Sequence, residues 1–242
     1  MSIAAYIPVR LQSSRLPKKA ILKIGDKTMI EHVYENTLKS KLVKYFFIAT
    51  CDLEIFHLMK KKGANVIMTS RKHKRATDRV YEAYSKTNKK IKKKISKIVM
   101  VQGDDPMLKP QMINEVILSN NNQHQVTNIC NTLNEKDSKD PNRVKVVINK
   151  KFEAVYFSRE QISFKKKRNK KLYLKQGNIF CFTPKILKKY CSISESNLEI
   201  VESVDMNRYL ENDIKIKMVH SKYDTINVDT LMDLKKVRSL LK

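Results

Sequence analysis

The 242-residue chain has little that would place it in a membrane or cross-link it covalently. It has no apolar run near the roughly 20 residues that a membrane-spanning helix needs. It opens directly on a strand-like apolar segment, without the basic and apolar regions of a leader, so we expect no secretory signal. Its four cysteines show neither C-x-x-C spacing nor nearby histidine partners. We therefore expect reduced, mostly buried thiols, no zinc site and a cytoplasmic protein.

Acidic residues are scarce relative to basic ones. The chain has 50 lysines and arginines against 24 aspartates and glutamates, which gives a formal net charge of +26. Such a charge is typical of nucleic-acid-binding proteins, but lysine dominates, much of it in helical surface stretches, and no aromatic-basic RNA motif is present. We therefore do not expect a nucleic-acid partner. Binding of a polyanion without catalysis stays open as the lesser alternative.

Strand and helix patterns alternate through the first half of the chain. Apolar runs predict buried strands at residues 3–7, 45–50, 66–68 and 97–101. Amphipathic patterns predict helices at residues 29–40, 52–62, 76–84 and 109–119, and a short extended piece at 20–24. A lysine run at 86–97 is typical of the exposed face or the end of a helix. Strand and helix alternating at this spacing predict a parallel, doubly wound α/β sheet.

The regular alternation of strands and helices ends in the second half of the chain. Strands are predicted at 125–132, 144–148, 154–157, 177–183 and 214–220, and helices at 184–191, 197–210 and 231–241. A basic loop at 165–171 is too short to link two domains, and the sequence contains no internal repeat. We therefore expect one domain, 1–242.

The loop after the first strand concentrates positive charge. It breaks from the strand at Pro8 and carries Arg10, Arg15, Lys18 and Lys19. These four cations repel one another, so the loop makes sense if it closes on a strongly anionic ligand such as a polyphosphate. Ligands of open α/β sheets bind beyond the carboxyl ends of the strands, which is where this loop lies. The alternative is a solvated basic loop.

Carboxylates occur at two similar positions. Asp104 and Asp105 directly follow the strand predicted at 97–101, and Asp229 lies in a strand-to-helix turn far away in sequence. Mg²⁺ commonly binds one or two carboxylates together with substrate phosphates. If Asp104 and Asp229 meet near the basic loop, they complete a magnesium and phosphate site. The alternative is that each aspartate caps a helix.

Eight segments occur in an order that resembles one enzyme family. They are I-P-V-R-L-Q-S-S-R-L-P-K-K (7–19), M-I-E-H-V-Y (29–34), I-A-T-C-D (48–52), T-D-R-V (77–80), V-Q-G-D-D-P (101–106), V-K-V-V (144–147), Y-F-S-R (156–159) and N-V-D-T (227–230). Together they resemble the sugar-acid cytidylyltransferases, most of all those that act on 3-deoxy-manno-octulosonate (Kdo). The match covers nearly the whole chain, and the first loop and V-Q-G-D are its specific pieces.

The resemblance implies a fold and a reaction. The expected fold is a mixed, mostly parallel α/β sheet with flanking helices, of the nucleotide-diphosphosugar-transferase type. Its nucleotide-binding half covers about 1–122, and its sugar-binding and dimerisation half about 123–242. The family reaction transfers the cytidylyl group of CTP to a 2-keto-3-deoxy sugar acid, with Mg²⁺ as cofactor, and releases pyrophosphate. It serves cell-surface polysaccharide or lipopolysaccharide synthesis, and the enzymes are usually homodimers.

The resemblance also assigns residues by position. At the nucleotide we expect Pro8, Arg10, Arg15, Lys19, Thr77, Arg79 and Gln102. At the sugar acid we expect Gln102, Arg159, Gln176, Glu202 and Asp205. The implied metal ligands are Asp104 and Asp229, and the implied catalytic residues are Arg15, Lys19 and Asp104.

Three segments depart from the family pattern. The family's H-x-S-G-T-[DE]-R segment has Arg75 and Ala76 in place of Ser-Gly, which alters a loop expected near the nucleotide base. H-x-G-I-Y-G-Y reads as residues 176–182, without the histidine and the two tyrosines expected near the sugar. In the helix predicted at 197–210, the usual glutamine is Met206. We therefore expect Kdo or a related sugar acid as the acceptor, and these changes favour the related acid. A nucleotidyltransferase for another base or another sugar is the alternative.

Overall fold

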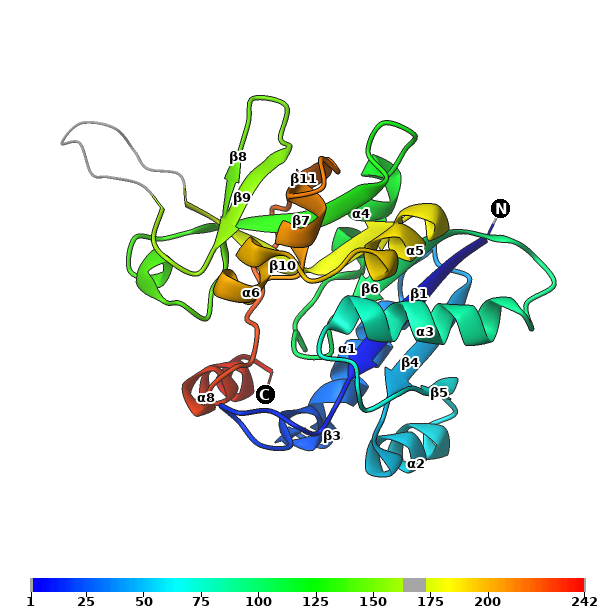
Figure 1. Cartoon of the computed structure of the whole chain (residues 1–242). Helices are drawn as coiled ribbons and strands as arrows, with labels where there is room; N and C mark the ends of the chain where they lie inside the picture. The colour runs from blue at the N-terminus through cyan, green and yellow to red at the C-terminus, as the bar shows by residue number, and fades with distance from the viewer. Residues whose placement is uncertain (1, 163–172, 242) are drawn as a thin grey trace.

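The computed structural model describes residues 2–162 and 173–241 and is shown in Figure 1. Its strands are β1 (Ser2–Val9), β2 (Lys23–Ile24), β3 (Lys27–Thr28), β4 (Tyr45–Thr50), β5 (Val66–Met68), β6 (Ile95–Val101), β7 (Val126–Leu133), β8 (Lys145–Ile148), β9 (Ala154–Ser158), β10 (Tyr173–Phe182) and β11 (Ile216–His220). Nine of them form one sheet, and β2 and β3 form a separate hairpin. The basic loop predicted at 165–171 lies outside the described residues.

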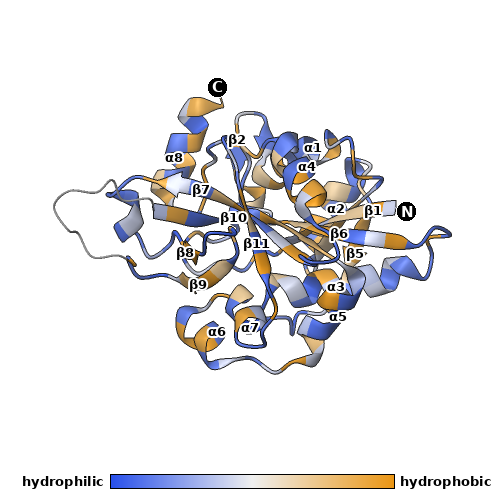
Figure 2. Cartoon of the chain, turned by 90° about the horizontal axis from the view of Figure 1, so that it is seen from above, coloured by the Kyte–Doolittle hydropathy of each residue, from blue (hydrophilic) through white to orange (hydrophobic). Residues whose placement is uncertain are grey.

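Helices cover both faces of the sheet. They are α1 (Met29–Leu38), α2 (Leu53–Lys61), α3 (Ala76–Asn88), α4 (Pro110–Ser119), α5 (Pro184–Ser192), α6 (Asn197–Glu202), α7 (Met206–Leu210) and α8 (Leu231–Leu240), with 3₁₀ turns at Lys19–Ile21 and Asp137–Lys139. Figure 2 shows α1, α2 and α4 on one side of the sheet, and α3, α5, α6 and α7 on the other. Each side has its own apolar core, because residues of α1, α2 and α4 fall in one cluster and those of α3, α5 and α7 in another.

One strand runs against the others in the main path of the sheet. The order is β11-β7-β10-β6-β1-β4-β5, and β10 is antiparallel to both of its neighbours. The remaining pairs along this path are parallel, so the carboxyl ends of β1, β6, β7 and β11 lie at one edge of the sheet, together with the start of β10. This confirms the predicted mixed, mostly parallel α/β fold.

The prediction of a single helix at 197–210 is wrong, because this segment forms two helices, α6 and α7. α6 ends at Glu202, and Ser203 adopts a left-handed conformation with φ of 51°. A residue in this region commonly terminates a helix. Val204 is then buried, and the Asp205 carboxylate accepts a hydrogen bond from Thr77, so α7 begins only at Met206.

Two shorter predictions also need correction. The extended piece expected at 20–24 begins instead with a 3₁₀ turn, since the amide of Ile21 donates to the carbonyl of Lys18. The lysine run at 86–97 holds the end of α3, as predicted, but it also extends into β6, where Ile95 pairs with Ser2. Ile91 packs against the core beneath, so the run joins a helix to a strand.

The remaining sequence features follow expectation. The four cysteines are free thiols, three of them buried. The C-terminal α8 packs on the β2–β3 hairpin through a small third core that includes Ile24, Leu234 and Val237 (Figure 1). Within residues 2–162 and 173–241, no helix combines the length and apolar character needed to cross a bilayer.

Candidate active site

A cavity of about 390 Å³ opens where β1 and β6 end. Its walls come from the loop after β1, the loop that leads into α3, and the segment after β6. Six of the seven residues predicted at the nucleotide line it: Pro8, Arg10, Arg15, Lys19, Arg79 and Gln102. The seventh, Thr77, is fully buried beside it and donates to Asp205 Oδ2 at 2.6 Å. The carboxyl edge of the sheet therefore gathers these residues as the sequence predicts.

A second, smaller cavity of about 160 Å³ lies beside the first. Four of the five residues predicted at the sugar acid line it: Gln102, Arg159, Gln176 and Asp205. Glu202 stands behind the wall, where its carboxylate accepts from Tyr156, Ser158 and the amide of Arg159. Arg15, Gln102 and Asp104 line both cavities, so the two hollows meet at these residues.

Charged groups of opposite sign converge at this junction. Lys19 Nζ donates to Asp104 Oδ2 at 2.9 Å and to Asp229 Oδ1 at 3.0 Å. Arg15 donates to the same Asp229 oxygen at 2.8 Å. Burial works against the Lys19 ammonium, but the two carboxylates outweigh it and raise the pKa of this lysine. Lys19 is therefore a fixed cation at the point where both cavities meet.

Neither aspartate is a helix cap. α4 begins after Lys109, and α8 begins after Thr230, whose hydroxyl bonds to the amide of Asp233. Asp229 is instead brought to the junction by its chain neighbour, since the amide of Val228 donates to the carbonyl of Asp104 at 2.8 Å. The capping alternative is thus wrong for both residues.

The donor set fits a divalent cation that is shared with a substrate. Oxygens of Asp104 and Asp229 both lie within 3.0 Å of one ammonium nitrogen, so they can face a single cation. In the described part of the chain, no group of three or more His, Cys, Asp or Glu residues forms a metal site. Two carboxylates alone suit Mg²⁺, which completes its coordination with phosphate oxygens and water.

Asp105 points away from this junction. Its side chain is buried, and Oδ2 accepts from Thr225 Oγ1 at 2.6 Å. Burial raises its pKa to about 6, while Thr225 and Lys175 act in the opposite direction. Asp104, and not Asp105, is therefore the member of the Asp-Asp pair that faces the junction, which is the member that the resemblance implies.

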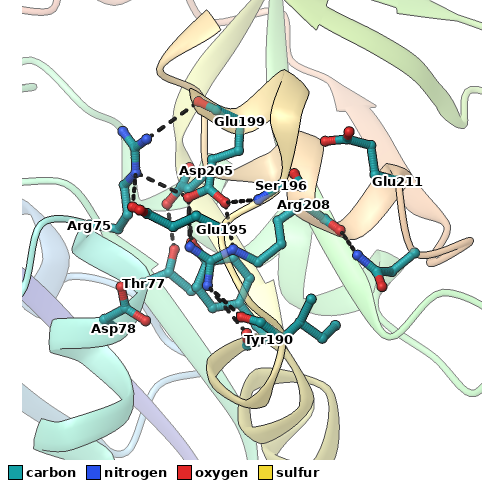
Figure 3. Close-up of polar contacts among 12 residues, drawn as sticks. Arg75, Thr77, Asp78, Tyr190, Glu195, Ser196, Glu199, Asp205, Arg208 and Glu211 are labelled. Atoms are coloured by element: carbon teal, nitrogen blue, oxygen red, sulfur yellow. Dashed lines mark hydrogen bonds and ion pairs between the residues drawn. The ribbon is translucent and has the colours of Figure 1, made fainter. Parts of the chain in front are cut away.

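A buried ionic cluster joins the walls of the two cavities (Figure 3). Arg75 lines the first cavity and donates to Glu199 Oε1 at 3.1 Å and to Ser203 Oγ at 3.0 Å. Ser203 lines the second cavity. Glu199 also accepts two bonds from Arg208, at 2.5 and 2.7 Å. Sequence reasoning missed this role of Arg75. The replacement of Ser-Gly by Arg-Ala was the signal that could have found it.

Three of the four changed positions expected on the sugar side lie in the core instead. Phe180 and Phe182 are buried, with ring centroids 6.2 Å apart, and line neither cavity. Met206 is buried as well. Phe180, Phe182 and Met206 belong to the core cluster on the side of the sheet that α3, α5 and α7 cover. The expectation that the lost tyrosine hydroxyls lay near the sugar is therefore wrong. Of the positions compared in β10, Gln176 does line the second cavity.

The second cavity also holds residues that sequence reasoning missed. Arg143, Lys175 and Asn178 line it beside the predicted ones. Lys175 is buried, and its ammonium donates to the carbonyl of Thr225 at 2.7 Å. Its position next to Gln176 was the available signal, because both lie near the start of β10 at the carboxyl edge.

Comparisons with known proteins agree with this geometry. The chain is 36% identical over 243 residues to 3-deoxy-manno-octulosonate cytidylyltransferase of Syntrophus aciditrophicus (strain SB), covering 99% of this chain and 97% of the relative. It is 34% identical to the enzyme of the same name from Bacteroides thetaiotaomicron, covering 100% and 99%.

Solved structures give the same result. The structure of CMP:2-keto-3-deoxy-manno-octonic acid synthetase complexed with CTP superposes with a TM-score of 0.90 at 32% identity, covering 100% of this chain and 98% of the other. A putative glucose-1-phosphate thymidylyltransferase from Bacillus anthracis shares the fold, with a TM-score of 0.72 at 14% identity, covering 99% and 95%. The sequence model of the cytidylyltransferase family matches residues 4–216. The chain is therefore a nucleotidyltransferase and belongs to the cytidylyltransferase family.

Proposed function

We propose that this enzyme transfers the cytidylyl group of CTP to Kdo and releases pyrophosphate, as a step toward a cell-surface polysaccharide or lipopolysaccharide. The junction of the two cavities carries the proposal, because Arg15, Gln102 and Asp104 face both the nucleotide side and the sugar side. Relatives at 33–36% identity over nearly the full length carry the name of the Kdo enzyme. Phe180 and Met206 are core residues, so the case for a related sugar acid as the second candidate acceptor rests on cavity residues such as Gln176.

The side chains at the junction suit an in-line attack on the α-phosphorus of CTP. The anomeric hydroxyl of the sugar must approach a phosphorus that is shielded by negative charge. Arg10, Arg15 and Lys19 would hold the triphosphate and neutralise charge on the departing pyrophosphate. Fixing both reactants in adjoining cavities supplies much of the remaining acceleration, about 7 kcal/mol or more for a well-aligned pair. No covalent intermediate is needed.

We propose that Mg²⁺ is the cofactor and that Asp104 and Asp229 hold it. When bound, it would neutralise negative charge on the phosphates and on the departing pyrophosphate. The ammonium of Lys19 lies between the same two carboxylates. Lys19 therefore keeps them close together, and its charge acts with that of the metal on the phosphates.

The proposal includes a homodimer acting in the cytoplasm, where CTP is made and thiols stay reduced. α6 exposes Ile200 and Val201, with 57% and 81% of each side chain accessible, and these are candidate contacts in the half expected to dimerise. Light scattering of the wild type and of Val201→Asp tests this. A monomeric wild type would contradict it.

The first experiment measures pyrophosphate release with Mg²⁺ and CTP, with and without Kdo. We expect release only when CTP and Kdo are both present, and a loss of about 100-fold or more in Asp104→Asn. Asp26→Asn, an exposed aspartate in the β2–β3 turn, is the matched control and should keep full activity.

Each of the other outcomes would support a different substrate or a different function. CTP binding without release would direct the assay to other sugar acids. Preference for UTP, GTP or ATP in competition would favour another nucleotidyltransferase. Failure to bind any nucleotide, with salt-dependent RNA binding, would replace the proposal with polyanion binding.

A further inference from the structure

β10 is irregular where it passes the junction of the cavities. Its pairing with β7 shifts register between Gln176 and Phe180. Gly177 lies so close to Ile129 that a Cβ added to the glycine would be 2.3 Å from Cγ2 of Ile129. Only glycine fits such a close approach, and irregularities of this kind often re-aim a side chain beside an active site.

A buried asparagine supports this irregular segment. Asn128 Nδ2 donates to the carbonyl of Gly177 at 3.0 Å and to that of Ile179 at 2.9 Å. Buried carbonyls need a hydrogen-bond donor, and the Asn128 amide supplies one to the carbonyl before residue 178 and one to the carbonyl after it. The backbone on both sides of Asn178 is therefore held in place by β7.

The segment directs Asn178 at Asp104. Asn178 Nδ2 donates to Asp104 Oδ1 at 2.7 Å, and its carbonyl accepts from the amide of Gln102 at 2.9 Å. Asn178 is 9% exposed and lines the second cavity. Two bonds thus tie this residue to the segment that carries the junction carboxylate.

We propose that Asn178 is a positioning residue that fixes the carboxylate of Asp104. Its amide holds Oδ1, so Oδ2 is left facing Lys19 and the place of the proposed cation. The donor is neutral, so it orients the carboxylate without adding a positive charge that would repel a metal. This inference rests on the proposed function, in which Asp104 is a metal ligand.

The feature belongs to this chain rather than to the pattern that it resembles. The segment H-x-G-I-Y-G-Y has glycine at the position of Asn178, and glycine offers no side-chain donor. Removal of a partner that orients a metal ligand typically weakens metal binding about 10–100-fold. We expect a loss of that size when the amide is removed.

The test measures Mn²⁺ binding to the whole protein by electron paramagnetic resonance. Asn178→Leu removes the donor at similar volume, and Asn178→Gly removes it without added bulk. We expect both variants to bind Mn²⁺ about 10–100-fold more weakly. The Mg²⁺ concentration for half-maximal pyrophosphate release should rise by a similar factor, while KM for CTP at saturating Mg²⁺ stays unchanged. Thermal unfolding shows which variant is folded.

A matched control removes the same kind of bond elsewhere. Asn149 Nδ2 donates to Glu153 Oε2 at 2.9 Å in an exposed turn, so Asn149→Leu should leave Mn²⁺ affinity unchanged. Asp104→Asn distinguishes a failure of the positioning role from a failure of the metal site. If it abolishes Mn²⁺ binding while both Asn178 variants bind as the wild type does, the positioning role is wrong. If Asp104→Asn also binds normally, the proposed metal site is wrong.

Discussion

Replacing Glu199 with glutamine should strongly destabilise the fold. Its carboxylate is completely buried and bonds to Arg208 and, at 3.1 Å, to Arg75. Arg208 is itself buried and lies 4.0 Å from the centre of the Tyr190 ring. Glutamine keeps the shape of the side chain but removes its charge, so Arg208 loses its buried counter-ion. Breaking a buried pair in this way costs about 3–5 kcal/mol.

Urea denaturation followed by circular dichroism measures this loss. A change of that size corresponds to a fall in Tm on the order of 10 °C for a chain of this length. Arg75→Ser should cost less, about 1–2 kcal/mol, because Arg75 is partly exposed and Arg208 keeps its partner. Glu211→Gln is the control, since that carboxylate is on the surface and bonds only to the amide of Leu198 among the described residues. The reasoning is refuted if Glu199→Gln costs no more than Glu211→Gln.

Two further substitutions test local features of the fold. Burial acts against the Glu31 carboxylate, but bonds from Lys62 and Thr28 lower its pKa from 4.5 to about 2. The stabilisation by this carboxylate is therefore present above pH 4.5 and is lost as the pH falls to about 2. Glu31→Gln should cost about 1 kcal/mol of unfolding free energy at pH 7 and almost nothing near pH 2. Denaturation at each pH measures this difference. Gly177→Ala should cost about 1–3 kcal/mol because its methyl group would overlap Ile129, and an unchanged Tm by calorimetry would contradict this.

Elements with a local cause could be predicted from the sequence. The strand at 45–50 matches β4, because a continuous apolar run bounded by polar residues has few alternatives. Thr28 caps α1 in a capping box with Glu31, a residue only three positions further along the chain. The carboxyl-edge rule then placed Arg10 and Lys19 at one cavity without knowledge of any contact.

The missed features depend on contacts between distant segments. β10 starts four residues before its predicted beginning, because the polar residues Lys175 and Gln176 belong to a strand that lies between two others. The ammonium of Lys175 is satisfied by Thr225, which no local pattern reveals. The sequence also cannot separate a residue that lines a cavity from one that supports its wall, as Thr77 and Glu202 show.

The place of β10 in the sheet also limits how the molecule can move and be divided. This strand comes from the half after residue 123, yet it pairs with β6 of the first half on one side and with β7 on the other. The two halves are therefore one cooperative folding unit. Fragments cut near residue 122 would each expose a long unpaired strand edge and should not fold when expressed separately. A hinge between the halves would have to break this pairing. Any closure over the substrates would then have to come from the loops at the rim of the cavities rather than from the sheet.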